Sequence, residues 1–477
     1  MLKSSYRNLL LLLISPCRIS LVWIPWCLCI GGFLLSVFLN YPGTPVMLML
    51  LEARTGIIVD LHPPIMAATL RFMFHICPNE QVGLGILYVI ENLLFWTGLL
   101  LVLLRGKRFW TNHSSKRYWM IAATLIPLIA LWIDLLTTTP LLSKDLLHFA
   151  CLLLATGLLL NMPHKTWQRF LVGMVILVLL YYGTALRYNA IFGLLPLLYW
   201  LSRLMIPSGK WIPVVSACLL WGAFIFVVHV INYHVLHAYR LYSLHERFYA
   251  DIFMLNYFGK NYENPPNGFR NNFDDVTEDI FRANYLYRHM YVPDAFRYVA
   301  KETGRSYNLV FEGVPIQQGE GPKQDGYLRE SDIQSFADDY VKLRNVWIRR
   351  ILQEPIIYTE VRAYFVLRFL FIDTPPAFML VTGGFLNGVS LLVAVMILSL
   401  HVKRLSSPFL VLAWSAALNG LPLFVFLPED GPGNIRYLYW FYAASFISIT
   451  YFCSQSVFFG KIVQVLQESL EELGEAG

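Results

Sequence analysis

The sequence predicts an all-α polytopic membrane protein, and three observations lead to this fold class. Of the 477 residues, 57% are hydrophobic and only 14% are charged, and the mean hydropathy is +0.53. Soluble globular domains carry about 25% charged residues, so this composition excludes a soluble fold. Apolar runs of roughly 20 residues recur along the chain, and this is the length that an α-helix needs to cross a bilayer.

We expect a bundle of about ten transmembrane helices (about 10–13, if partly inserted segments are included). The predicted spans are 21–40, 83–104, 119–137, 145–162, 168–186, 190–205, 212–233, 376–400, 407–427 and 437–457. Basic residues fill the loops on one side of this arrangement, for example Arg18, Arg117, Arg169 and Lys403. Positively charged loops stay in the cytoplasm, so both termini are expected inside, in a multi-pass protein of the inner (plasma) membrane. The formal net charge of +6 then reflects topology, and no nucleic-acid partner is expected.

This topology divides the chain into four parts. They are an N-terminal transmembrane module at 1–233 with its first outer loop at 41–82, an extracytoplasmic domain at 234–375, C-terminal transmembrane helices at 376–457 and a cytoplasmic tail at 458–477. The extracytoplasmic domain is expected to be mainly helical. Its stretch 331–354 has apolar residues near helical spacing, with Ser331 as N-cap and Pro355 as the end or kink of the helix.

The stretch EARTGIIVDLHPP, residues 52–64, is the polar segment on which the functional interpretation centres. It lies on the outer side, and Asp60 is followed by His62 and a rigid Pro63–Pro64 pair. One interpretation makes Asp60 a general base or an acceptor-orienting carboxylate in a turn fixed by the prolines. The alternative is an ordinary acid in a surface loop.

Other charged residues fall at or just beyond the outer ends of the predicted spans. They are Asp134, Lys144, Asp145, Arg187, Asp251, Glu429, Asp430 and Arg436. Charged groups at membrane depth are costly and usually functional. Because packed helices bring their outer ends side by side, we expect these residues and Asp60 to form one polar site covered by residues 234–375.

Several of these positions also have a purely structural interpretation. Lys144 and Asp145 are candidates for a phosphate-binding pair, but Asp145 also suits the first turn of a helix, where an acid is favourable. Arg187 is a candidate for gripping an anionic headgroup, with Tyr188 and Asn189 beside it, or for snorkelling to the interface.

The remaining polar groups are interpreted more simply. Tyr437 follows Arg436 after a glycine turn, in a region that also fits an aromatic belt. Glu91 and Asn92 stand inside the second predicted span, where we interpret them as a buried hydrogen-bonded pair. Three histidines near the end of the span 212–233 approach a ligand-like spacing, but no carboxylate or cysteine accompanies them, so we assign no metal site.

Together these landmarks resemble the membrane glycosyltransferases of the GT-C superfamily, whose pattern is an acid in the first outer loop, many spans and a large extracytoplasmic segment. The resemblance covers most of the chain. It rests on Asp60–His62–Pro63–Pro64, Lys144–Asp145, Arg187–Tyr188–Asn189, Arg436–Tyr437 and the segments 244–266 and 347–355. These motifs look like those of bacterial members, distantly similar to protein O-mannosyltransferases and the lipid A aminoarabinose transferase.

The resemblance implies a GT-C-like bundle and an inverting transfer of a sugar from a polyprenyl-phosphate donor to an extracytoplasmic acceptor. Asp60 would be the base that activates an acceptor hydroxyl or amine. The residues implied for the donor phosphate are Lys144, Arg187 and Arg436. Those implied for positioning donor or acceptor are Glu52, His62, Asp134, Asp145 and Asp251. Those implied for contact with the sugar or the lipid are Tyr188, Asn189 and Tyr437.

The sequence departs from the family pattern at one point that concerns a cofactor. Family members often carry paired acids within the first outer loop, whereas Glu52 stands eight residues before Asp60. A divalent metal, on which some relatives depend, is therefore left open as a cofactor, and no residue is assigned to it.

Two other classes of protein compete with the glycosyltransferase interpretation. A transporter or flippase for a lipid-linked or small solute favours internal repeats and ionisable groups near the membrane midplane. Here the charges gather at one end of the spans instead. A non-catalytic envelope assembly protein would explain residues 234–375, but not the acids and arginines at separate outer turns.

Overall fold

The structure is a computed structural model of the chain, and it describes part of the sequence. The described residues are 23–39, 47–56, 58, 60, 63–110, 144–187, 190–206, 209, 211–238, 310–311, 314–315, 344–345, 347–360, 362–363, 408–426, 440–441, 443–445 and 447–448. The predicted spans 119–137 and 376–400 and most of the predicted domain 234–375 lie outside these residues. The division into four parts therefore stays a prediction.

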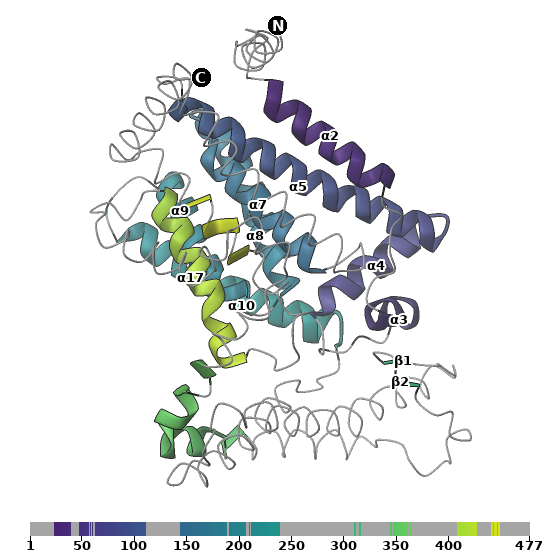
Figure 1. Cartoon of the computed structure of the whole chain (residues 1–477), viewed down its shortest axis with the longest axis vertical. Coiled ribbons are helices and arrows are strands. Elements are labelled where there is room, and N and C mark those ends of the chain that lie inside the picture. Colours follow the sequence, from purple (N-terminus) through teal and green to yellow (C-terminus); the bar gives the residue numbers. More distant parts are fainter. Residues whose placement is uncertain are drawn as a thin grey trace, which may run out of the picture.

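Helices make up nearly all of the described part (Figure 1). They are α2 (Trp23–Leu39), α3 (Met47–Thr55), α4 (Pro64–Ile76), α5 (Glu80–Trp110), α7 (Lys144–Leu160), α8 (Thr166–Ala185), α9 (Ile191–Met205), α10 (Ile212–Val230) and α17 (Pro408–Phe426). A π-helix, η2 (Ile231–Val235), continues α10. Two short strands, β1 (Val310–Phe311) and β2 (Val314–Pro315), pair antiparallel. Residues 347–353 and 355–360 are helical and are separated at Glu354, just before Pro355.

Three of the described helices are long and apolar enough to cross a membrane. These candidate spans are Glu80–Leu104, Thr166–Ala185 and Ile212–Val235, and they coincide with three of the predicted spans to within a few residues. Shorter apolar helices lie at Pro25–Val37, Pro64–Ile76, Ile191–Met205 and Leu410–Gly420. The described chain is thus helical and has the apolar helices of a membrane protein.

Helix α7 is the core of the bundle. It packs between α5 and α8, and α9 touches it as well. Almost every side chain from Asp145 to Leu160 is buried. A helix that is apolar on nearly all sides can lie in the interior of a bundle, as α7 does.

Two glycines let the backbones of α5 and α7 come into direct contact. A Cβ atom added to Gly98 would lie 2.6 Å from the backbone nitrogen of Leu154. One added to Gly157 would lie 2.9 Å from the carbonyl oxygen of Gly98. Small residues at such contacts allow the close packing that drives helix association within a bilayer. The crossing of α5 and α7 therefore depends on glycine at both positions.

Polar side chains fix α2 along α5, and the two helices lie next to each other in Figure 1. The hydroxyl of Tyr88 donates a hydrogen bond to the carbonyl of Ser36 at 2.8 Å. The indole Nε1 of Trp96 donates to the Ser36 hydroxyl at 3.1 Å. Within an apolar bundle these buried groups would be costly if left unpaired, so they fix the register of the pair.

A similar contact joins α9 to α17, which is far away in the sequence. The hydroxyl of Ser415 donates to the carbonyl of Gly193 at 2.6 Å, and the indole of Trp440 donates to the same hydroxyl at 3.0 Å. The described residues after 407 are thereby packed against the N-terminal bundle.

We predict that Gly98→Ala lowers the stability of the protein. The added methyl group would press on the backbone of α7, and overpacking of this kind costs about 1–3 kcal/mol. Gly85→Ala, in the same helix, is the matched control, because no described atom lies within 4 Å of a Cβ atom there. Alanine is the better helix former, so this control should be neutral or stabilising. Thermal unfolding of both variants in detergent measures the difference, and equal melting temperatures would contradict the prediction.

Candidate functional site

The region predicted as the first outer loop, 41–82, contains two short helices, α3 and α4, and its place on the outer side stays a prediction. The sequence of α3, MLMLLEART, consists largely of good helix formers, and α4 begins with Pro64 at its first position. Glu52 consequently lies on α3 with only 3% of its surface exposed, and not in a loop.

Asp60 lies in the short turn between these two helices. Gly56 follows α3 with a φ of +77°, a conformation that favours glycine. Pro63 and Pro64 end the turn, with Pro64 as the first residue of α4. The prolines restrict the backbone where the turn meets α4, and Asp60 is half-buried within the turn.

The carboxylate of Asp60 is held by a tyrosine from the end of a candidate span. The Tyr233 hydroxyl donates a hydrogen bond to Asp60 Oδ2 at 2.9 Å, across 173 residues of sequence. Ile58, Ala67 and Ala238 form a small apolar cluster against which Tyr233 packs. The sequence analysis did not single out Tyr233. Its position in the polar segment INYH, directly after an apolar run, indicates a polar residue at the end of a span.

Tyr233 belongs to the π-helix η2. The Leu236 amide donates to the Ile231 carbonyl at 2.8 Å, five residues back, and the Ala238 amide donates to the Asn232 carbonyl at 2.9 Å. Single π-helical turns are frequent at functional sites. The ring of His229 lies 4.9 Å from that of Tyr233, centre to centre. No group of three or more metal-ligating side chains occurs in the part of the chain that the structure describes.

Asp145 and Arg187 form a buried ion pair. Nε of Arg187 donates to Asp145 Oδ1 at 2.5 Å, and Nη2 contacts the same oxygen. The residues are only 2% and 4% exposed. Asp145 lies in the first turn of α7 and Arg187 just after α8, so each charge also suits the dipole of its helix. The sequence analysis gave the two residues separate roles and did not predict that they bind each other.

Two more ionisable side chains complete a buried charged cluster, made of Glu91, Asp145, His148 and Arg187. His148 Nδ1 lies 2.7 Å from the Gly183 carbonyl, and the imidazole interacts electrostatically with Asp145 and Arg187. Glu91 reaches the cluster from α5 and interacts with the charge of Asp145.

The predicted Glu91–Asn92 pair is wrong. Asn92 Nδ2 donates to the Tyr88 carbonyl at 3.0 Å, one helical turn back. Glu91 is completely buried, and neither of its carboxyl oxygens has a hydrogen-bond partner among the described residues. Neighbours in sequence point to different sides of a helix, which explains why the two side chains separate.

Helix α4 links the Asp60 turn to the charged cluster. Its Ala67 packs beside η2, and its Thr69 hydroxyl lies 2.9 Å from the Tyr182 hydroxyl on α8, within hydrogen-bonding distance. Tyr182 in turn interacts electrostatically with Glu91. The candidate site therefore consists of the Asp60 turn, η2 and the charged cluster, and α4 connects them through Ala67 and Thr69.

Lys144 is the other predicted site residue that the structure describes. It is the first residue of α7, half-buried and next to Asp145. The remaining predicted site residues lie outside the described residues, so their roles stay predictions. They are His62, Asp134, Tyr188, Asn189, Asp251, Arg436 and Tyr437.

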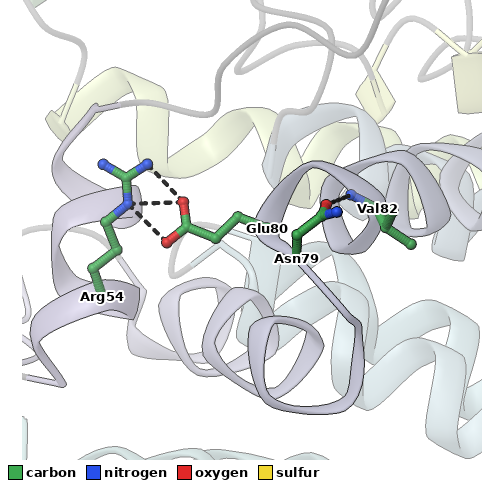
Figure 2. A network of polar contacts seen from close by, with 4 residues as sticks. All are labelled: Arg54, Asn79, Glu80 and Val82. Carbon is green, nitrogen blue, oxygen red and sulfur yellow. Dashed lines mark hydrogen bonds and ion pairs between the residues drawn. The ribbon is translucent and has the colours of Figure 1, made fainter.

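An exposed ion pair joins the end of α3 to the start of α5 (Figure 2). Arg54 Nε donates to both carboxyl oxygens of Glu80, at 3.1 and 3.0 Å, and its Nη2 donates to Oε2 at 2.7 Å. Beside it, Asn79 Oδ1 accepts a hydrogen bond from the Val82 amide at 2.9 Å and thereby caps α5. Both side chains of the pair are exposed, so the pair contributes little to the stability of this region.

Comparisons with protein-family models, with curated proteins and with solved structures gave no match to this chain.

We predict that Asp145→Asn strongly destabilises the protein. The substitution leaves the Arg187 guanidinium buried without its counter-charge, and breaking a buried pair in this way costs about 3–5 kcal/mol. Arg54→Gln breaks the exposed pair with Glu80 and should cost less than about 1 kcal/mol. Unfolding in detergent compares the two variants. The double variant Asp145→Asn/Arg187→Gln should recover part of the loss, whereas equal effects of Asp145→Asn and Arg54→Gln would contradict the prediction.

Proposed function

We propose that this chain is a membrane glycosyltransferase of the GT-C type. It transfers a sugar, a hexose or a pentose, from a polyprenyl-phosphate donor to an extracytoplasmic acceptor, and Asp60 acts as the base. The full bundle of about ten spans, the location in the inner (plasma) membrane and the cytoplasmic termini belong to this proposal. Residues 234–375 would then cover the site from the outer side.

The observation that carries the proposal is the setting of Asp60. It is the only one of the described acids predicted for the site that is not buried, because Glu52 and Asp145 are 3% and 2% exposed. A base must reach both its substrate and, after the reaction, water, so a half-buried carboxylate is suited to the role. The Tyr233 hydroxyl fixes its orientation at 2.9 Å, at the end of a candidate span.

The proposed reaction is a single displacement at the anomeric carbon. The acceptor oxygen or nitrogen forms a bond to that carbon while the bond from the carbon to the donor phosphate oxygen breaks. The polyprenyl phosphate leaves with the bonding electron pair, and the acceptor proton moves to the Asp60 carboxylate. Attack from the side opposite the phosphate inverts the configuration.

The charged cluster would support this chemistry from inside the bundle. Arg187 neutralises Asp145, and the pair ties α7 to α8 next to α4, the helix that follows the Asp60 turn. In this proposal Arg187 can bind the donor phosphate only if its ion pair with Asp145 opens. Lys144 and Arg436 are proposed for the phosphate as well.

We predict that Asp60→Asn abolishes transfer while the protein still folds and inserts. The amide cannot accept the proton, and loss of a general base lowers rates by about 10²–10⁴-fold. Transfer from a panel of polyprenyl-phosphate hexoses and pentoses is measured with the purified protein in liposomes. Tyr233→Phe keeps the carboxylate and removes only the hydrogen bond to it, so its loss should be smaller. Normal activity of Asp60→Asn would refute the role of Asp60.

A transporter is the second candidate function, and Glu91 is the observation that favours it. This acid lies inside the candidate span Glu80–Leu104 and is completely buried. Ionisable groups inside membrane helices often mark the path of an ion or a substrate. A glycosyltransferase needs no such path. In that case Glu91 takes no part in the reaction and only lies buried beside Asp145.

We predict that Glu91→Gln leaves sugar transfer unchanged and does not lower the melting temperature. The amide has nearly the same shape, and the carboxyl group that it replaces has no hydrogen-bond partner among the described residues. Proteoliposomes with wild-type protein and with Glu91→Gln are compared for proton flux and for flipping of a fluorescent polyprenyl phosphate. A flux that wild type supports and Glu91→Gln abolishes would favour the transporter.

A further inference from the structure

A second arginine lies at the Asp60 turn, and the sequence analysis did not single it out. Arg71, on α4, lays its guanidinium directly on the backbone of Gly56. A Cβ atom added to Gly56 would lie 2.5 Å from Cζ of Arg71 and would contact Nη1 even more closely. Gly56 also has a φ of +77°. The backbone conformation favours glycine at position 56, and the Arg71 guanidinium lies against this glycine.

The charge of Arg71 has no counter-charge in the described part of the chain. Other arginines there are engaged: Arg54 binds Glu80, and Arg187 binds Asp145. Arg169 donates to the carbonyls of Pro163 and His164. No described carboxylate or carbonyl oxygen pairs with the Arg71 guanidinium.

A guanidinium without a counter-charge in this position is suited to bind an anionic ligand. Arg71 is half-buried and lies on an apolar helix, where an uncompensated charge is costly. Its planar fork presents parallel N–H groups that match the oxygens of a phosphate. The guanidinium rests on the turn that holds Asp60, four residues after Gly56.

We propose that Arg71 binds the phosphate of the polyprenyl-phosphate donor, and this inference rests on the proposed function. It would hold the phosphate within the same turn that holds the base. When the bond between the sugar and the phosphate oxygen breaks, the phosphate gains negative charge, and Arg71 stabilises that charge. Arg187, whose charge is already neutralised by Asp145, is then not needed as the phosphate ligand.

The test is the binding of fluorescent polyprenyl monophosphate to the full-length protein in phosphatidylcholine nanodiscs. Arg71→Met keeps an unbranched apolar stem over Gly56 and removes the charge, and the expected result is binding weaker by about tenfold or more. Arg71→Lys keeps the charge without the fork and should fall between Arg71→Met and wild type. Arg54→Gln, in the same region but paired with Glu80, is the control and should bind as wild type does.

Further arms separate the inference from its alternatives. Asp60→Asn should bind the polyprenyl monophosphate at least as tightly as wild type, because the substitution removes a negative charge near the phosphate and leaves Arg71 in place. Unlabelled polyprenyl monophosphate should displace the probe, whereas phosphatidylglycerol and inorganic phosphate should not. The melting temperature of Arg71→Met should equal or exceed that of wild type, because the substitution removes an uncompensated charge. A purely structural arginine would instead lower the melting temperature when replaced and leave the affinity of the folded protein unchanged.

Three results would overturn the inference. If wild type and Arg71→Met bind the probe equally, Arg71 is not the phosphate ligand, although the proposed function stands. If phosphatidylglycerol competes as well as polyprenyl monophosphate, Arg71 binds bilayer headgroups instead of the donor. If wild type binds no polyprenyl monophosphate, the proposed function fails together with the inference.

Discussion

The buried ion pair between Asp145 and Arg187 is the interaction on which the rest of the site depends. In an apolar bundle either buried charge would be strongly destabilising without the other. The ion pair therefore holds the start of α7 against the end of α8. Because α8 is held in place, its Tyr182 hydroxyl can form a hydrogen bond with the Thr69 hydroxyl, and this contact attaches α4 to the core. The Asp60 turn, which leads into α4, thereby gains a rigid support.

The helical character and three candidate spans could be predicted, because the apolar length of a span is a local property of the sequence. The span predicted at 168–186 corresponds to Thr166–Ala185, and the one predicted at 212–233 corresponds to Ile212–Val235. Apolar length alone gives such boundaries to within a few residues. The helices α3 and α4, of 9 and 13 residues, were not predicted, because helices this short fall below the length of a membrane span.

The site was harder to predict than the spans, because its contacts join residues distant in sequence. Asp60 was singled out from its own turn, but its partner Tyr233 is 173 residues away, and Arg187 is 42 residues from Asp145. Nothing in one sequence states which helix ends become neighbours. Arg71 is the clearest case: inside an apolar stretch it resembles a snorkelling side chain, and only the position of Gly56 reveals what it touches.

The π-helix η2 determines in which direction the side chains at the end of the candidate span Ile212–Val235 point. It accommodates an additional residue within a helical turn, and the side chains of 231–235 take their directions from that insertion. Each residue of an α-helix advances by about 100°, so a chain with one residue fewer here would present a different side chain to Asp60. In related chains, surface loops can therefore change length freely. A deletion between 231 and 235 would instead remove the contact between Tyr233 and Asp60, and so would mark a chain that has lost this site.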